Sequence, residues 1–192
     1  IAALLAHRKL SKERNIKHAI SFHKNISRAK EFTQLNNLLN NQLGFVNVSG
    51  FHVSGKMGTS ARNFEIEKFR ESDNAIISNA RCLTEGVDIP IVDAVVFADS
   101  KKSLIDIVQA SGRAMRTHPL KNLGYIIIPV ILDETEDIVN DAFKQLVDVV
   151  AALGISDERV IDEAKEVVKS KKFGSREILE FEEYSPDIEI SF

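Results

Sequence analysis

The chain has 192 residues, of which 44% are hydrophobic and 28% charged, and its formal net charge is −3. This length fits one domain of ordinary size with an appendage, and no apolar run approaches the roughly 18 residues of a membrane span. The sequence has no secretory leader, and its single cysteine excludes an internal disulfide and a cysteine-rich zinc cluster. We therefore expect a cytoplasmic domain without a membrane contact and, since its first residue is not methionine, part of a longer polypeptide.

The charge is distributed unevenly along the chain. Residues 1–132 hold 18 lysines and arginines against 11 aspartates and glutamates, which is +7, whereas residues 133–192 hold 7 against 17, which is −10. The basic part suits a phosphate backbone, although an ordinary soluble surface explains the same charge.

Short β-rich runs alternate with helical patterns over the first 130 or so residues. Strands are expected at 16–22, 50–55, 74–80, 93–99 and 124–130, and helices at 25–43, 59–72 and 103–116. Asn25 or Ser27 is expected to cap the first of these helices, and Phe64 and Phe69 are expected to face inward from the second. Pro129 predicts that the last strand ends near a sheet edge or a boundary. The alternation predicts an α/β fold with a parallel sheet and crossover helices.

The pattern changes after Asp133. Two amphipathic helices are expected at 135–153 and 156–171, followed by a stretch in which apolar and acidic residues alternate. We therefore predict a domain over residues 1–133, a helical appendage over 134–172 and an acidic tail or linker over 173–192.

Four polar stretches follow the expected strands, at the edge where open α/β sheets bind their ligands. They are "SFHKN" (21–25), "HVSGKMGTSAR" (52–62), "ARCLTEGVDIP" (80–90) and the helix "QASGRAMR" (109–116). In order along the chain they resemble the second, C-terminal RecA-like domain of superfamily 2 helicases over roughly residues 15–130. "AISFHKNISRAKEF" is similar to motif IV, "LTEGVDIP" to motif V and "QASGRAMR" to motif VI, Q-x-x-G-R-x-x-R. This form of motif V resembles that of restriction-enzyme motor subunits and the excision-repair helicase, which act on DNA.

The resemblance implies a fold and a nucleotide. The fold would be a RecA-like parallel sheet with helices on both faces, and ATP with Mg²⁺ would be bound mainly by an N-terminal RecA-like domain of the same polypeptide. Arg113 and Arg116 would reach the γ-phosphate, because a guanidinium stabilises the charge that develops on a transferred phosphoryl group. Gln109 would contact the phosphate or the attacking water. The residues expected beside the nucleotide or the domain interface are Gly86, Asp88 and Gly112.

The resemblance also implies a nucleic-acid surface on the loops. Ser54 and Gly55 at a strand end, and Thr84 before the glycine of motif V, are expected to donate to phosphates. His23 and Lys24 are expected to extend that surface. DNA is the expected partner, with RNA as the alternative.

Each assignment has a plainer alternative. The motif VI arginines on their helix could be solvated or paired with acidic residues, and Asp88 could shape a turn before Ile89 and Pro90. Ser54 and Thr84 could cap helices, and His23 and Lys24 could be ordinary surface residues.

One stretch imitates a phosphate-binding loop. Gly50, Gly55 and Lys56 have the spacing G-x-x-x-x-G-K, but Met57 stands where the loop needs a serine or threonine for Mg²⁺. With no acidic quartet at a strand end either, we expect this chain alone to bind ATP weakly and not to hydrolyse it. The alternatives are a non-catalytic RecA-like interaction module and another nucleotide-binding enzyme such as a dehydrogenase. The latter is disfavoured because no G-x-G-x-x-G follows the first strand.

Overall fold

The computed structural model describes residues 1–41, 46–80, 82–83, 89–99, 104–114, 118–119, 123–129 and 148–154. In chain order its elements are α1 (Ala2–Arg14), β1 (His18–Phe22), α2 (Ile26–Leu38), the 3-10 turn η1 (Leu39–Asn41), β2 (Ser49–Val53), α3 (Thr59–Glu71), β3 (Ala75–Asn79), β4 (Ala94–Phe97), α4 (Leu104–Ala114) and β5 (Tyr125–Ile127). A further helical segment covers 148–154. The five strands and three helices that the pattern predicted before residue 133 are all present.

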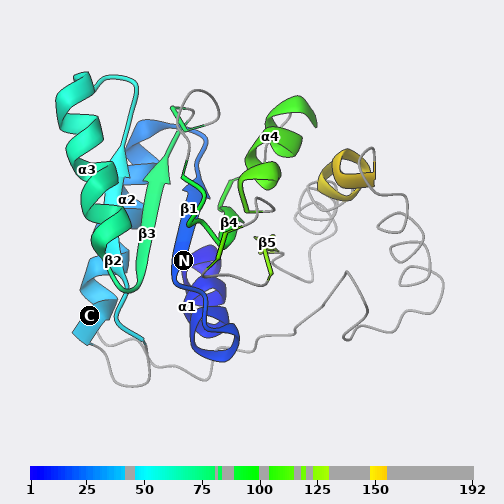
Figure 1. Ribbon diagram of the computed structural model, residues 1–192, viewed down its shortest axis with the longest axis horizontal. Helices are drawn as coiled ribbons and strands as arrows, with labels where there is room; N and C mark the ends of the chain where they lie inside the picture. Colours follow the sequence, from blue (N-terminus) through cyan, green and yellow to red (C-terminus); the bar gives the residue numbers. More distant parts are fainter. Residues whose placement is uncertain are drawn as a thin grey trace.

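The five strands form one parallel sheet in the order β2-β3-β1-β4-β5 (Figure 1). β1 lies in the centre, where Ser21 is in register with Ser78 of β3 and Val96 of β4. β5 is the outermost strand on one side of this sheet among the described residues, and it ends at Ile127, two residues before Pro129. The prediction of a strand end near a sheet edge or boundary agrees with this position. The expectation of a parallel sheet is confirmed.

Helices cover both faces of the sheet, and strand periodicity divides the core between them. On β1, Ile20 and Phe22 pack with residues of α3 and α4, whereas Ala19 packs on the other face with residues of α1 and α2. Successive strand residues point to opposite faces, so every central strand contributes to both cores. In Figure 1, α3 lies in front of β2 and α2 lies behind β2 and β3.

Helix α1 was not predicted, and a buried arginine explains its attachment. Arg8 is 1% exposed and its guanidinium donates to Asn36 Oδ1 and Asn40 Oδ1, both at 2.8 Å, and to the carbonyl oxygen of Val46. A buried guanidinium needs this many acceptors, because an unpaired buried charge is costly. Burial still lowers the pKa of Arg8 to about 10. The arginine ties α1 to α2 and to the chain before β2.

The outer face of α3 differs from the prediction, whereas its first residue, Thr59, agrees with it. The helix begins after Gly58, with no side-chain cap from a threonine or serine, and Phe64 is 59% exposed while Phe69 is fully buried. The ammonium of Lys68 lies 4.4 Å from the centre of the Phe64 ring, which covers part of it. Phe69 and Ile66 provide the buried contacts, so the expectation that Phe64 faces the core is wrong.

The helical segment 148–154 is the part of the predicted appendage that lies within the described residues. Its Val149 and Ala152 are buried in the same core cluster as Ala110 and Ala114 of α4. This segment therefore packs on the domain. The rest of 134–172 and all of 173–192 lie outside the described residues, and the domain boundaries stay a prediction. Within the described residues, no helix combines the length and apolarity that a membrane crossing needs.

Candidate functional site

The carboxyl edge of the sheet has a point where the chain leaves two neighbouring strands in opposite directions. β1 and β4 are adjacent, and α2 follows β1 onto one face while α4 follows β4 onto the other. Open α/β sheets bind ligands at such a switch point, because the two following loops separate there. Residues 23–25 and Ala98–Asp99 form this point.

Asp99 joins the two loops at the switch point. Its carboxylate accepts a hydrogen bond from the backbone N–H of Lys24 at 3.0 Å, and Arg28 Nη1 donates to its other oxygen. The Asp99 side chain is 10% exposed, whereas that of Arg28 is 61% exposed. Arg28 also lies in the first turn of α2, whose N-terminus is capped by Asn25, as predicted. The residues that carry these links, Asp99 and Arg28, were not singled out from the sequence.

His23 lies beneath the switch point, not on the surface. It is 5% exposed, its Nε2 lies 3.0 Å from Ser21 Oγ, and its ring packs 4.8 Å from that of Phe32. Burial lowers the pKa of His23 to about 4, although Asp99, 3.8 Å from Nδ1, opposes the shift. The expectation of a surface histidine is wrong, because the ring fills space between β1 and α2. Lys24 is exposed, as predicted.

Asn79 connects the end of β3 to the same edge. It is fully buried, its amide Nδ2 donates to the carbonyl oxygen of Ser21 at 3.2 Å, and its Oδ1 accepts from the backbone N–H of Leu83 at 3.4 Å. Its own carbonyl oxygen accepts from the backbone N–H of His23 at 2.9 Å. Asn79 therefore anchors the start of the loop that holds "LTEGVDIP" to the end of β1. A polar residue at the end of a buried strand was the signal for it in the sequence.

The loop after β2 forms a turn in which the predicted phosphate donors differ in exposure. Ser54 is 3% exposed and its carbonyl oxygen accepts from the backbone N–H of Met57 at 3.1 Å, while Gly55 and Lys56 are exposed. A Cβ at Gly55 would meet nothing within 4 Å. The backbone at Gly55 is therefore better exposed to a phosphate than the Ser54 side chain.

Gly50 shows why this stretch is no phosphate-binding loop. It lies inside β2, and its N–H and carbonyl groups pair with the side chain of Asn37 at 2.8 and 3.2 Å. A Cβ there would lie 2.6 Å from Asn36 Nδ2 and 2.7 Å from Asn37 Oδ1. Only a glycine allows the side chains of Asn36 and Asn37 to approach β2 this closely. The rejection of a phosphate-binding loop therefore agrees with the structure.

Helix α4 carries the predicted motif VI residues. Gln109 is exposed, whereas Arg113, one turn later, is 7% exposed and lies beside the fully buried Ala110 and Ala114. The two side chains have the predicted spacing, but only Gln109 lies on the surface. A Cβ at Gly112 would meet nothing within 4 Å, so crowding within the described residues does not explain this glycine.

Four predicted site residues lie outside the described residues. They are Thr84, Gly86, Asp88 and Arg116. Leu83 and Ile89, which flank the three motif V residues among them, are buried in the core on the α3 and α4 face. Both ends of the motif V loop are therefore anchored. The roles of these four residues stay predictions.

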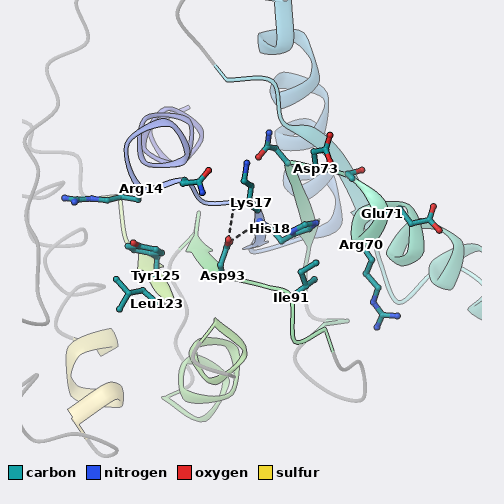
Figure 2. A pocket seen from close by; sticks show the side chains of 13 residues that line it. Arg14, Lys17, His18, Arg70, Glu71, Asp73, Ile91, Asp93, Leu123 and Tyr125 are labelled. Carbon is teal, nitrogen blue, oxygen red and sulfur yellow. Dashed lines mark hydrogen bonds between the residues drawn. The ribbon is translucent and has the colours of Figure 1, made fainter. Parts of the chain in front are cut away.

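The amino edge of the sheet, opposite the switch point, has an open depression of about 820 Å³ (Figure 2). The Asp93 carboxylate, which lies beside it, accepts from the backbone N–H groups of Lys17 at 2.8 Å and His18 at 3.0 Å. Burial raises the pKa of Asp93, although those two hydrogen bonds oppose the shift. Arg70, from the last turn of α3, lies on the same rim. None of the predicted site residues lines this depression.

The described residues contain no group of three or more histidine, cysteine, aspartate or glutamate side chains placed to hold a metal ion. The exposed polar groups at the carboxyl edge, Lys24, Gly55 and Gln109, suit phosphate or amide contacts. These residues fit one side of a nucleotide or nucleic-acid site better than a complete triphosphate cradle.

The parallel order β2-β3-β1-β4-β5, with helices on both faces of the sheet, is that of a RecA-like α/β domain. Residues 2–118 match the family described as the helicase conserved C-terminal domain. The chain belongs to that family and is the C-terminal domain of a superfamily 2 helicase.

Three known proteins to which the chain is similar include helicases and a restriction enzyme. The putative ATP-dependent helicase IRC3 of Saccharomyces cerevisiae is 32% identical over 62 residues, which are 32% of this chain and 9% of that protein. The pre-mRNA-processing ATP-dependent RNA helicase PRP5 of Kluyveromyces lactis is 28% identical over 101 residues, 53% of this chain and 12% of that protein. A solved structure of the ATP-dependent Type ISP restriction-modification enzyme LlaBIII bound to DNA has a TM-score of 0.65 and 29% identity, covering 83% of this chain and 12% of that one. The chain thus spans about a tenth of the length of the curated relatives it matches.

Proposed function

We propose that this chain is the C-terminal motor domain of an ATP-dependent DNA helicase or translocase. ATP and Mg²⁺ are bound mainly by an N-terminal RecA-like domain of the same polypeptide, and this chain closes the nucleotide site and grips the nucleic-acid backbone. Hydrolysis opens and closes the cleft between the two domains. The observation that carries the proposal is the match of residues 2–118 to the helicase C-terminal family, in a parallel sheet whose switch point lies directly after β1 and motif IV.

In this proposal Arg113 and Arg116 are arginine fingers. A guanidinium beside the γ-phosphate contributes on the order of 10³ to 10⁵ in rate, because it stabilises the charge of the transferred phosphoryl group. Arg113 is 7% exposed, so its side chain must become accessible when the N-terminal domain and ATP are in place. Gln109, which is exposed one turn earlier, contacts the phosphate or the attacking water, and Gly86, Asp88 and Gly112 line the nucleotide or the domain interface.

The nucleic-acid backbone is held by the loops of the carboxyl edge. Lys24 and the Gly55 backbone are exposed on the loops after β1 and β2, which flank the end of β3, and Thr84 adds a hydroxyl from motif V. Ser54 and His23 support these loops from below, because both side chains are buried. Backbone contacts of this kind fix the position of a strand without reading its sequence.

DNA is favoured by two observations. The E-G-x-D-x-P form of motif V resembles that of enzymes acting on DNA, and LlaBIII, which is bound to DNA in its structure, has the same fold at 29% identity. RNA is the second candidate, because the relative PRP5 is an RNA helicase and is 28% identical over 53% of this chain.

The test is the ATPase activity of the polypeptide that carries this chain together with its N-terminal domain. We expect hydrolysis to rise with added duplex or single-stranded DNA and to respond weakly to RNA of the same length and sequence. A stronger response to RNA would replace the DNA proposal by the RNA alternative. A response to neither, in a folded protein that contains a phosphate-binding loop upstream, would favour a non-catalytic interaction module.

A further inference from the structure

We propose that Asp99 is a positioning residue: its carboxylate holds the loop after β1 in a fixed relation to the segment that leads from β4 into α4. Lys24 and α4 would then respond to nucleic acid and nucleotide as one unit. This inference rests on the proposed function, and it adds the link between the nucleic-acid loop and the motif VI helix.

The bond from Lys24 N–H to Asp99 carries this link. At 3.0 Å it is a hydrogen bond to a charged acceptor with a side chain that is only 10% exposed, and such bonds are stronger than bonds between neutral groups. The Arg28 ion pair contributes less, because its guanidinium is 61% exposed and solvent screens surface pairs. The backbone bond also fixes the chain at Lys24 itself, whereas a flexible arginine leaves it free to move.

The surroundings of Asp99 make the link rigid. Ala98 N–H donates to the carbonyl oxygen of Phe22 at 3.2 Å, which continues the pairing of β1 and β4 up to the switch point. The ring of the buried His23 packs against that of Phe32. The backbone N–H of His23 donates to the carbonyl oxygen of Asn79. Because the carboxyl ends of β1, β3 and β4 are held together at these described residues, a displacement of one end is passed to the others.

Asp93 offers a matched control at the other end of β4. It also accepts backbone N–H groups from the chain beside β1, at Lys17 and His18, and it is 8% exposed. It lies at the amino edge, at the opposite end of β4 from Asp99 and therefore away from Lys24. Replacing it removes the same type of bond between the same two segments without touching the carboxyl edge.

The experiment compares Asp99→Ala, Asp99→Asn and Asp93→Ala in the polypeptide that carries this chain and its N-terminal domain. ATP hydrolysis is measured against DNA concentration, at a temperature well below the melting temperature of each variant. Asp99→Ala is expected to lower DNA-stimulated turnover about tenfold, since a displacement of about 1 Å can cost up to 10²-fold in rate. Asp99→Asn keeps an oxygen for Lys24 N–H and is expected to recover most of the loss, and Asp93→Ala is expected to keep the wild-type response.

Two outcomes would overturn the inference. In the first, DNA stimulates ATP hydrolysis by Asp99→Ala as strongly as by the wild type. In the second, Asp93→Ala and Asp99→Ala both lose stimulated hydrolysis in proportion to their fall in melting temperature. A wild-type protein without stimulated hydrolysis would instead overturn the proposed function. In that case backbone amide spectra of this chain decide the role of Asp99. Shifts in Asp99→Ala that reach Gln109 and Gly112 as well as Lys24 support the link, and shifts confined to Lys24 refute it.

Discussion

The two edges of the sheet use the same chemistry for different purposes. At each end of β4 an aspartate accepts backbone N–H groups from the chain beside β1: Asp93 at the amino edge and Asp99 at the carboxyl edge. Asp93 accepts two such bonds beside an open depression, while Asp99 accepts one and also pairs with the exposed Arg28. Exposed Lys24 and Gly55 lie at the carboxyl edge, as does Leu83 at the start of the motif V segment, whereas the chain has returned to the amino edge by Ile91, which lines the depression.

The difference follows from the direction of parallel strands. All five carboxyl ends lie at one edge, where the chain turns outward into loops, so ligand groups gather there. At the amino edge the chain returns from the helices, and a buried carboxylate serves mainly to satisfy backbone groups. We therefore expect substitutions at the amino edge to lower stability and those at the carboxyl edge to lower activity.

The largest expected effect is that of Arg113→Ala on hydrolysis. In the polypeptide with its N-terminal domain, DNA-stimulated ATP turnover should fall by about 10³-fold or more, because the transition-state charge loses its guanidinium. DNA binding should stay largely intact. The measurement is steady-state turnover together with DNA titration.

Arg70→Ala is the control for this substitution. Arg70 pairs with Glu67 on α3 and lies at the amino edge. It should leave turnover unchanged. Wild-type turnover in a folded Arg113→Ala protein would remove the assignment of Arg113 as an arginine finger.

The next effect concerns stability at the amino edge. Asp93→Ala should lower the free energy of unfolding by about 2–6 kcal/mol, because it leaves the N–H groups of Lys17 and His18 without their acceptor, at roughly 1–3 kcal/mol each. Asp99→Ala should cost less, since it frees one such group and a mostly exposed arginine. Denaturant titration of this chain measures both, and a larger loss in Asp99→Ala would contradict the division between the edges.

Acidification should weaken the domain through its buried histidines. Burial lowers the pKa of His23 to about 4 and that of His7 to about 3, from an ordinary 6.5. The unfolded chain therefore binds more protons below pH 6.5, and the free energy of unfolding falls by about 2 kcal/mol per histidine between pH 7 and 5. The raised pKa of Asp93 acts in the opposite direction, since the folded state takes up that proton first.

His23→Gln tests the share of the carboxyl edge in this effect. This substitution should remove about half of the fall in the free energy of unfolding that His23 and His7 cause between pH 7 and 5. Denaturant titration at both pH values measures it. Among the charged or titratable groups that act on His23, Asp99 raises its pKa, and His52, Arg28 and the amino group of Ile1 lower it. A pH dependence equal to that of the wild type would show that His23 is not held neutral.

The smallest effect should come from a residue at neither edge. Phe64→Ser on the outer face of α3 should change the free energy of unfolding by no more than about 0.5 kcal/mol, since the ring is 59% exposed. Thermal melting of this variant provides the baseline for the two edges. A loss of more than about 1 kcal/mol would mean that Phe64 packs against a surface the described residues do not include.

Local pattern was sufficient to predict much of the domain. The strands at β1, β3 and β4 are short apolar runs, which are buried on both faces in a parallel sheet, and Asn25 is a strong helix cap. The ordered motifs predicted the family, and Pro129 predicted that the last strand ends near it. The outer position of Phe64 was not predicted, because a helix pattern with few apolar residues does not show which of them the sheet covers.

The sequence by itself determined the fold class, the order of the elements and the family, because these depend on periodicity and on motifs of short range. Only the tertiary structure showed that His23 and Arg113 are buried, that Arg8 secures α1, and that Asp99 and Asn79 join three loops. Those contacts join residues far apart in the chain. They exist because a parallel sheet brings the carboxyl ends of its strands to one edge, and strand order, which no local pattern encodes, decides which loops become neighbours.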